Sequence, residues 1–75
     1  MRAHTLHKGE QAIAIDCTPQ RVTVDIGGYR YMPEWRSDDE LQTGTTPGIP
    51  EFVAFGDGYV IFDKPADENI SVFVE

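Results

Sequence analysis

Hydrophobic and polar residues alternate along three successive segments in the first half of the chain. The segments run from Gln11 to Cys17, from Arg21 to Ile26 and from Tyr29 to Trp35. Alternation with a period of two is typical of strands that have one face in a core and the other in water. The pattern therefore predicts three consecutive strands, whose inward residues are Ile13, Ile15, Cys17, Val22, Val24, Ile26, Tyr29 and Tyr31.

Gly27 and Gly28 separate the second of these segments from the third, and glycine readily adopts the positive φ of a two-residue hairpin turn. Folding the chain there gives cross-strand pairs that are either apolar or oppositely charged, which stabilises neighbouring strands. The predicted pairs are Val24 with Tyr31, Ile26 with Tyr29, Asp25 with Arg30, and Arg21 with Glu34. A turn at residues 17–20, which contains Pro19, joins the first and second segments in the same way and lets Asp16 meet Arg21.

A second hairpin is predicted from Phe52 to Phe62, around the three-residue loop Gly56-Asp57-Gly58. In that register Phe55 lies opposite Tyr59, and both faces of the strand pair are apolar. Such a pair needs cover on both sides, either from its own domain or from a second copy of the chain. The candidates for a self-interface are Phe52, Phe55, Tyr59, Ile61 and Phe62.

Weaker strand patterns occupy both ends of the chain, from Ala3 to His7 and from Ile70 to Val74. Together with the segments above they predict an all-β fold, an antiparallel meander of six to seven strands that forms a barrel or a sandwich. A chain of 75 residues is expected to form one domain over residues 1–75, because it is too short for a second core.

The segment from Arg36 to Pro50 interrupts the strand pattern, and long loops in small domains are often functional. Ser37 and Glu40 have the spacing of a capping box, which predicts a short helical turn that Gly44 would end. The rest of the segment is predicted to be an extended connector restricted by its prolines.

Charge narrows the possible partners. The chain has 13 acidic and 6 basic residues, and its net charge of −7 repels phosphate backbones and anionic lipids. The carboxylates concentrate at Asp38, Asp39 and Glu40 and again between Asp63 and Glu68. We therefore expect no direct contact with nucleic acid or membrane, and a protein partner with a basic surface.

Few residues in the sequence have the spacing or surroundings expected of catalytic or metal-binding sites. His4 and His7 lie three residues apart on a predicted strand, so they point to opposite faces and do not predict a metal site. Cys17 is expected in the core, which suits a reducing cytoplasm. The carboxylates lie in polar stretches and are expected to be solvated, and common catalytic motifs are absent. The chain is expected to be a cytoplasmic protein that is not an enzyme and uses no cofactor.

The predicted binding residues lie where the third strand ends. Trp35 is an aromatic anchor beside charged residues, a composition typical of protein-binding hot spots, although it would equally suit a cap on the end of a barrel. The expected site comprises Trp35, Arg36, Asp38, Asp39 and Glu40. The first hypothesis is a non-enzymatic interaction module, in its sharper form an inhibitor encoded by a phage or mobile element that occupies a basic, nucleic-acid-binding groove. The alternative is a self-associating structural subunit, such as a virion component.

Overall fold

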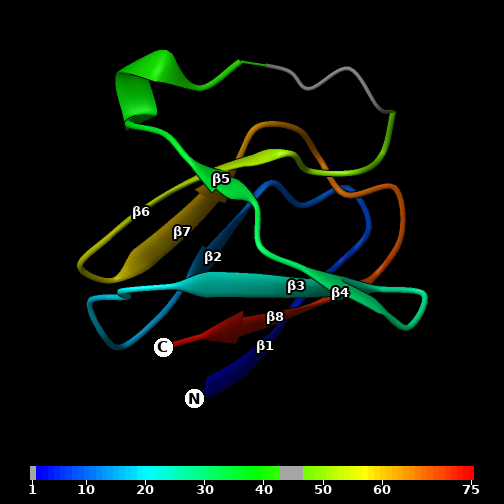
Figure 1. Cartoon of the computed structure of the whole chain (residues 1–75), viewed down its shortest axis with the longest axis horizontal. Helices are drawn as coiled ribbons and strands as arrows, with labels where there is room; N and C mark the ends of the chain where they lie inside the picture. The colour runs from blue at the N-terminus through cyan, green and yellow to red at the C-terminus, as the bar shows by residue number, and fades with distance from the viewer. Residues whose placement is uncertain (1, 43–46) are drawn as a thin grey trace.

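The computed structural model describes residues 2–42 and 47–75, which form two four-stranded sheets (Figure 1). The strands of the first sheet, in spatial order, are β1 (Arg2–Leu6), β8 (Ile70–Val74), β3 (Val22–Ile26) and β4 (Tyr29–Tyr31). Those of the second are β2 (Ala12–Ala14), β7 (Tyr59–Phe62), β6 (Phe52–Gly56) and β5 (Glu34–Trp35). A single 3-10 turn, η1 (Asp38–Glu40), is the helical element among the described residues.

The two sheets pack face to face as a sandwich, which confirms the all-β class but not the barrel, because the sheets are not closed into one. The described residues form eight strands rather than six or seven. The up-and-down order is also wrong, since β8 inserts between β1 and β3, and β5 runs parallel to β6. Such pairings join segments that are distant in the sequence, and local alternation carries no information about them.

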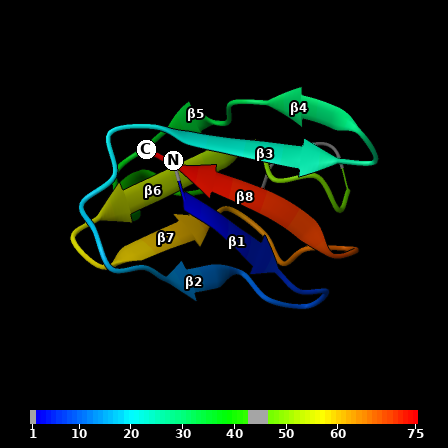
Figure 2. The ribbon, with the colours of Figure 1, turned by 90° about the horizontal axis from the view of Figure 1, so that it is seen from below.

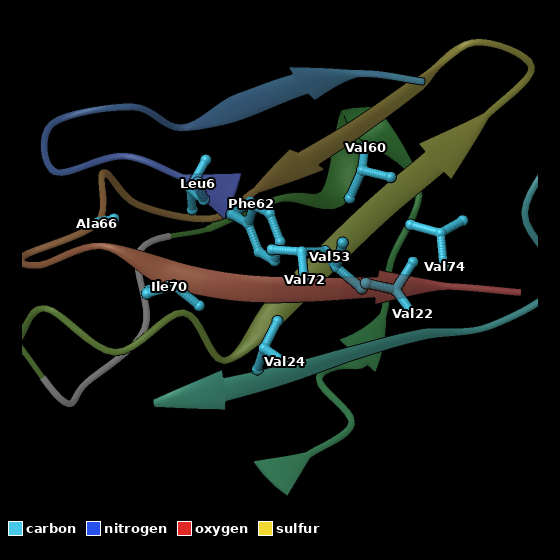
Figure 3. Packing of buried hydrophobic residues seen from close by; sticks show 10 residues of the cluster. All are labelled: Leu6, Val22, Val24, Val53, Val60, Phe62, Ala66, Ile70, Val72 and Val74. Carbon is cyan, nitrogen blue, oxygen red and sulfur yellow. The ribbon is translucent and has the colours of Figure 1, made fainter. Parts of the chain in front are cut away.

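Aliphatic side chains from both sheets fill the space between them (Figure 3). Six of the ten buried residues of this cluster are valines, whose branched side chains pack well on a pleated surface. Phe62 is the largest residue of the cluster, and its side chain is completely buried. The cluster comprises Leu6, Val22, Val24, Val53, Val60, Phe62, Ala66, Ile70, Val72 and Val74.

The predicted hairpin of β3 and β4 is confirmed in its register. Its pairs are Val24 with Tyr31, Asp25 with Arg30 and Ile26 with Tyr29. Both turn glycines have positive φ, 59° at Gly27 and 85° at Gly28. The predicted pair of Arg21 with Glu34 does not form, because β4 ends at Tyr31 and Glu34 belongs to the other sheet. Arg21 instead forms an ion pair with Glu75.

The predicted partner of β2 is wrong. β2 pairs with β7, and the residues that follow it carry the chain from the second sheet to the first. Ile13, Ile15 and Cys17 still pack against the core, but from the opposite side. Asp16 consequently pairs with Arg2 rather than with Arg21. Alternation identifies the residues that face a core and leaves the neighbouring strand undetermined.

The hairpin of β6 and β7 exists, but its loop is one residue shorter than predicted. Gly56 lies opposite Tyr59, so only Asp57 and Gly58 remain outside the strands, and Gly58 has the expected positive φ of 89°. A shift of one residue changes every cross-strand partner. The core-facing row is therefore Val53, Phe55, Val60 and Phe62, and the outer row includes Phe52, Ala54, Tyr59 and Ile61.

Candidate functional site

Trp35 lies on β5, at the edge of the second sheet, and 54% of its surface is exposed. Its ring makes an edge contact with Phe55, with the centroids 6.3 Å apart. Together with Met32 these two rings line a groove of about 380 Å³ that reaches the buried residues Val22 and Val53. Trp35 thus stands beside an opening between the two sheets instead of covering the end of a barrel.

Arg36, the next residue, contacts the outer face of the second sheet. Its guanidinium lies 4.7 Å from the centroid of the Phe52 ring and forms an ion pair with Glu34 at 3.2 Å. A polar hollow of about 280 Å³ is lined by Arg36, Glu40, Gln42 and Phe52. Adjacent residues of a strand point to opposite faces. The predicted site therefore divides, with Trp35 on one side of β5 and Arg36 on the other.

The acidic residues Asp38, Asp39 and Glu40 form η1 and are all exposed. Ser37 makes no side-chain capping bond, and the turn closes instead through a backbone bond in which the Glu40 N–H donates to the Ser37 carbonyl. The predicted stop at Gly44 lies outside the described residues. The Tyr59 hydroxyl donates to Asp38 at 3.3 Å. The negative charge of Asp38, then burial and this hydrogen bond, raise the pKa of Tyr59.

The segment after β5 covers the outer face of the β6–β7 hairpin, which is the second apolar face noted in the sequence (Figure 1). Ala54 on that face is only 1% exposed. Of the five self-interface candidates, Phe62 lies inside the core, whereas Phe52, Phe55, Tyr59 and Ile61 are half-buried. The cover that the doubly apolar hairpin requires thus comes at least partly from its own chain.

The sequence analysis did not predict that Tyr29 and Met32 are exposed. Tyr29 is predicted to face the core, yet it is 71% exposed, because β4 is an edge strand and the opposite sheet does not cover its ring. Met32 is 61% exposed and lies between β4 and β5, outside both strands. The sequence does mark this position as the end of a strand, because the following Pro33 cannot donate a ladder hydrogen bond and is confined to strand ends and edges.

Tyr31 behaves differently from Tyr29, although the two rings stack 6.0 Å apart. Its hydroxyl donates to the Pro50 carbonyl at 2.6 Å. Burial, followed by the charges of Asp63 and Glu51, raises the pKa of Tyr31 to about 12. Tyr31 is therefore held by the connector before β6 and has a structural role.

The described residues form no cluster suited to metal binding. Among the described residues, no three His, Cys, Asp or Glu side chains are grouped so that they could hold a metal ion. Cys17 is a free, half-buried thiol. Asp63 departs from the expected solvation, since it is only 6% exposed and accepts a hydrogen bond from the Glu51 N–H at 3.0 Å. That bond ties the start of β6 to the end of β7.

No helix in the described part of the chain is long and apolar enough to cross a membrane. Comparison of the chain with protein-family models, with curated proteins and with solved structures finds no match, so the site stands on its geometry alone.

Proposed function

We propose that this chain is a non-enzymatic protein that binds another protein through the surface formed by Tyr29, Met32 and Trp35, here called the edge surface. One observation supports this most strongly. Four large hydrophobic residues are exposed in the described part of the chain, and three of them fall within the seven residues from Tyr29 to Trp35. Exposed apolar side chains that include aromatic rings are typical of protein-binding sites.

The charge of the chain supports a basic partner. Asp38, Asp39 and Glu40 follow the edge surface directly in the sequence, and the net charge is −7. Apolar contacts would supply affinity at the edge surface, and the carboxylates would accelerate association and select the partner. In its sharper form the proposal is that the protein is an inhibitor, in which these carboxylates bind where a basic groove otherwise holds phosphates.

Site-directed photo-cross-linking tests the proposal. A photoreactive residue is placed at position 32 in one variant and at position 5, on the exposed face of β1, in another, and both are expressed in the source cells. A protein cross-linked from position 32 and not from position 5 identifies the partner. Equal yields from both positions, or none from position 32, would contradict the proposal.

Affinity measurements with that partner then separate the contribution of the apolar side chains from that of the carboxylates. Trp35→Ala is expected to weaken binding at least tenfold, as at an aromatic hot spot. Asp39→Asn with Glu40→Gln should slow association and reduce its dependence on salt. The matched control is Asp67→Asn with Glu68→Gln, which removes the same two charges from another exposed segment. Equal effects of the two double variants would show that only the overall charge matters.

The self-associating alternative draws less support from the structure. The outer face of the β6–β7 hairpin is already in contact with Arg36 and Asp38, and Phe62 is enclosed in the core. A second copy would also bring a further charge of −7 to the interface.

A further inference from the structure

A hollow of about 350 Å³ lies beside the tip of the β3–β4 hairpin. Ile26, Tyr29 and Tyr31 of the hairpin line it, together with Ile49 from residues 47–50, here called the connector. The tip of the hairpin reaches past the ends of β6 and β7, at the end of the sandwich where the connector also runs (Figure 2). The hollow is therefore open to solvent, and Tyr29 is 71% exposed.

The walls of this hollow are apolar or aromatic side chains. The Tyr31 hydroxyl is already bonded to the Pro50 carbonyl, and the rings of Tyr31 and Tyr29 stack 6.0 Å apart. Aromatic rings attract cations, and a guanidinium suits them best because it is planar and weakly hydrated. A strongly hydrated ammonium or carboxylate would lose its water without a polar group to replace it.

The chain itself places guanidinium groups on half-buried rings elsewhere. Arg30 lies 4.6 Å from the centroid of the Phe73 ring, and Arg36 lies 4.7 Å from that of Phe52. A guanidinium at Tyr29 has to come from another molecule, because all four arginines of the chain are held in ion pairs. These pairs are Arg2 with Asp16, Arg21 with Glu75, Arg30 with Asp25 and Arg36 with Glu34.

Three other hollows are less suited to a cation, because each has one of these arginines in its wall. Arg21 lines the groove beside Trp35, and Arg36 lines the polar hollow at Phe52. Arg2 lines a hollow of about 500 Å³ formed by β1 and the end of β2. In each of them a cation of the chain competes with an incoming one for the nearby carboxylates and rings. The hollow beside Tyr29 has no charged residue in its wall.

Carboxylates surround the connector, which forms one wall of the hollow. Glu51 follows it directly, and the Glu51 N–H donates to Asp63 at 3.0 Å. After burial, the charges of these two residues raise the pKa of Tyr31, so their negative potential reaches the tyrosine. Asp67 packs against the connector, and Lys64 is the one cation between residues 37 and 75. Three carboxylates and one ammonium leave this end of the molecule negative, which attracts a cation.

From these observations we infer that the hollow between Tyr29 and Ile49 receives an arginine side chain of the protein partner. The guanidinium would lie against the tyrosine rings, and the aliphatic stem would pack against Ile26 and Ile49. The inference rests on the proposed function, because Tyr29 belongs to the edge surface, and it specifies which side chain of the partner is recognised there.

The probe is capped arginine, N-acetylarginine N-methylamide, titrated into the full chain at constant ionic strength and followed by NMR. We expect saturable shifts of the ring protons of Tyr29 and Tyr31 and no comparable shift of the Trp35 indole. Two matched probes separate charge from shape. Capped citrulline has the same shape without the charge, and capped lysine carries its charge on a strongly hydrated ammonium. Both should bind at least threefold more weakly.

Variants of Tyr29 locate the bound probe, and its exposure means that they remove no core packing. Tyr29→Phe keeps the ring and should leave the affinity for capped arginine within twofold. Tyr29→Leu keeps an apolar side chain without the ring and should weaken binding at least threefold. Equal binding of capped citrulline, undiminished binding to the leucine variant, or the absence of a saturable shift would each overturn the inference. Shifts at Trp35 as large as those at Tyr29 would also overturn it, because they would show adventitious binding to exposed rings.

The partner found by cross-linking distinguishes failure of the inference from failure of the proposed function. If a protein is cross-linked from position 32 but binds the Tyr29→Leu variant as tightly as the unaltered chain, the inference is wrong and the proposed function stands. If capped arginine binds beside Tyr29 and no protein is cross-linked from position 32, the proposed function fails while the arginine site remains.

Discussion

The Tyr59 hydroxyl donates a hydrogen bond to Asp38, with 3.3 Å between the two oxygens. This bond connects β7 in the second sheet to the acidic turn that follows Trp35. It holds the turn against the outer face of the β6–β7 hairpin, where Arg36 also packs on Phe52. The same segment therefore covers an apolar face and presents the carboxylates that we propose for partner binding.

The core makes the most direct stability prediction. Phe62→Ala removes the largest fully buried side chain and should lower the free energy of unfolding by about 3–5 kcal/mol. Ile61→Ala is the matched control, because Ile61 is the residue before Phe62 and its side chain is half-buried on the outer face. This substitution should lower the free energy of unfolding by less than half as much. Urea denaturation of the two variants measures the difference, and equal losses would contradict the observed register of β7.

Two glycines with similar backbone angles should respond differently to substitution by alanine. Gly48 and Gly9 have φ of 76° and 87°, but a Cβ at Gly48 would lie 2.5 Å from the Cβ of Asp67, and a Cβ at Gly9 would meet nothing within 4 Å. Gly9→Ala should cost about 1 kcal/mol for its positive φ. Gly48→Ala should cost about 2–3 kcal/mol because overpacking adds to that strain. Thermal unfolding tests this order, and a reversed order would refute the packing of Gly48 against Asp67.

The raised pKa of Tyr31 predicts a loss of stability in alkali. The folded protein keeps the Tyr31 proton up to a pKa of about 12, whereas the unfolded chain releases it near the ordinary value of 10.0. The stabilisation is therefore complete below pH 10 and decreases as the pH rises to about 12. Tyr31→Phe should flatten this part of the pH profile, and Tyr29→Phe, at an exposed ring, should not. Identical profiles for the two variants would contradict the burial of the Tyr31 hydroxyl.

The solution mass separates the two functional hypotheses. Light scattering after size exclusion should give the mass of one chain at both low and high salt, because the apolar outer face of the β6–β7 hairpin is in contact with its own chain and two copies repel each other. An oligomer that persists at both salt concentrations would instead support the structural subunit.

The sequence predicts the β3–β4 hairpin with its register because the information is local: two glycines fix the turn, and charges and apolar residues then match across it. The strands that pair with β2 and β8 cannot be predicted from local patterns in this way. Alternation shows that Ile13 faces a core, but it does so from the sheet opposite to β3, and that arrangement depends on contacts between distant segments.

The candidate site was predictable to a similar extent. The aromatic and charged composition of the stretch around Trp35 makes it a candidate site, and in the structure the Trp35 side chain is exposed. Tyr29 was missed because alternation places it on the apolar face of β4, and only the three-dimensional structure shows that this edge is uncovered. The division of Trp35 and Arg36 between two faces follows from the alternation of strand residues, but requires knowing that β5 pairs with β6.

The central claim is that a partner binds along β4 and β5, and hydrogen exchange tests it most directly. The exchange of backbone amides is measured for the protein alone and in complex with the partner identified by cross-linking. We predict slower exchange in residues 29–35 on binding, with no change in residues 2–6 on the opposite edge. Protection confined to residues 52–62, with residues 29–35 unchanged, would contradict the account.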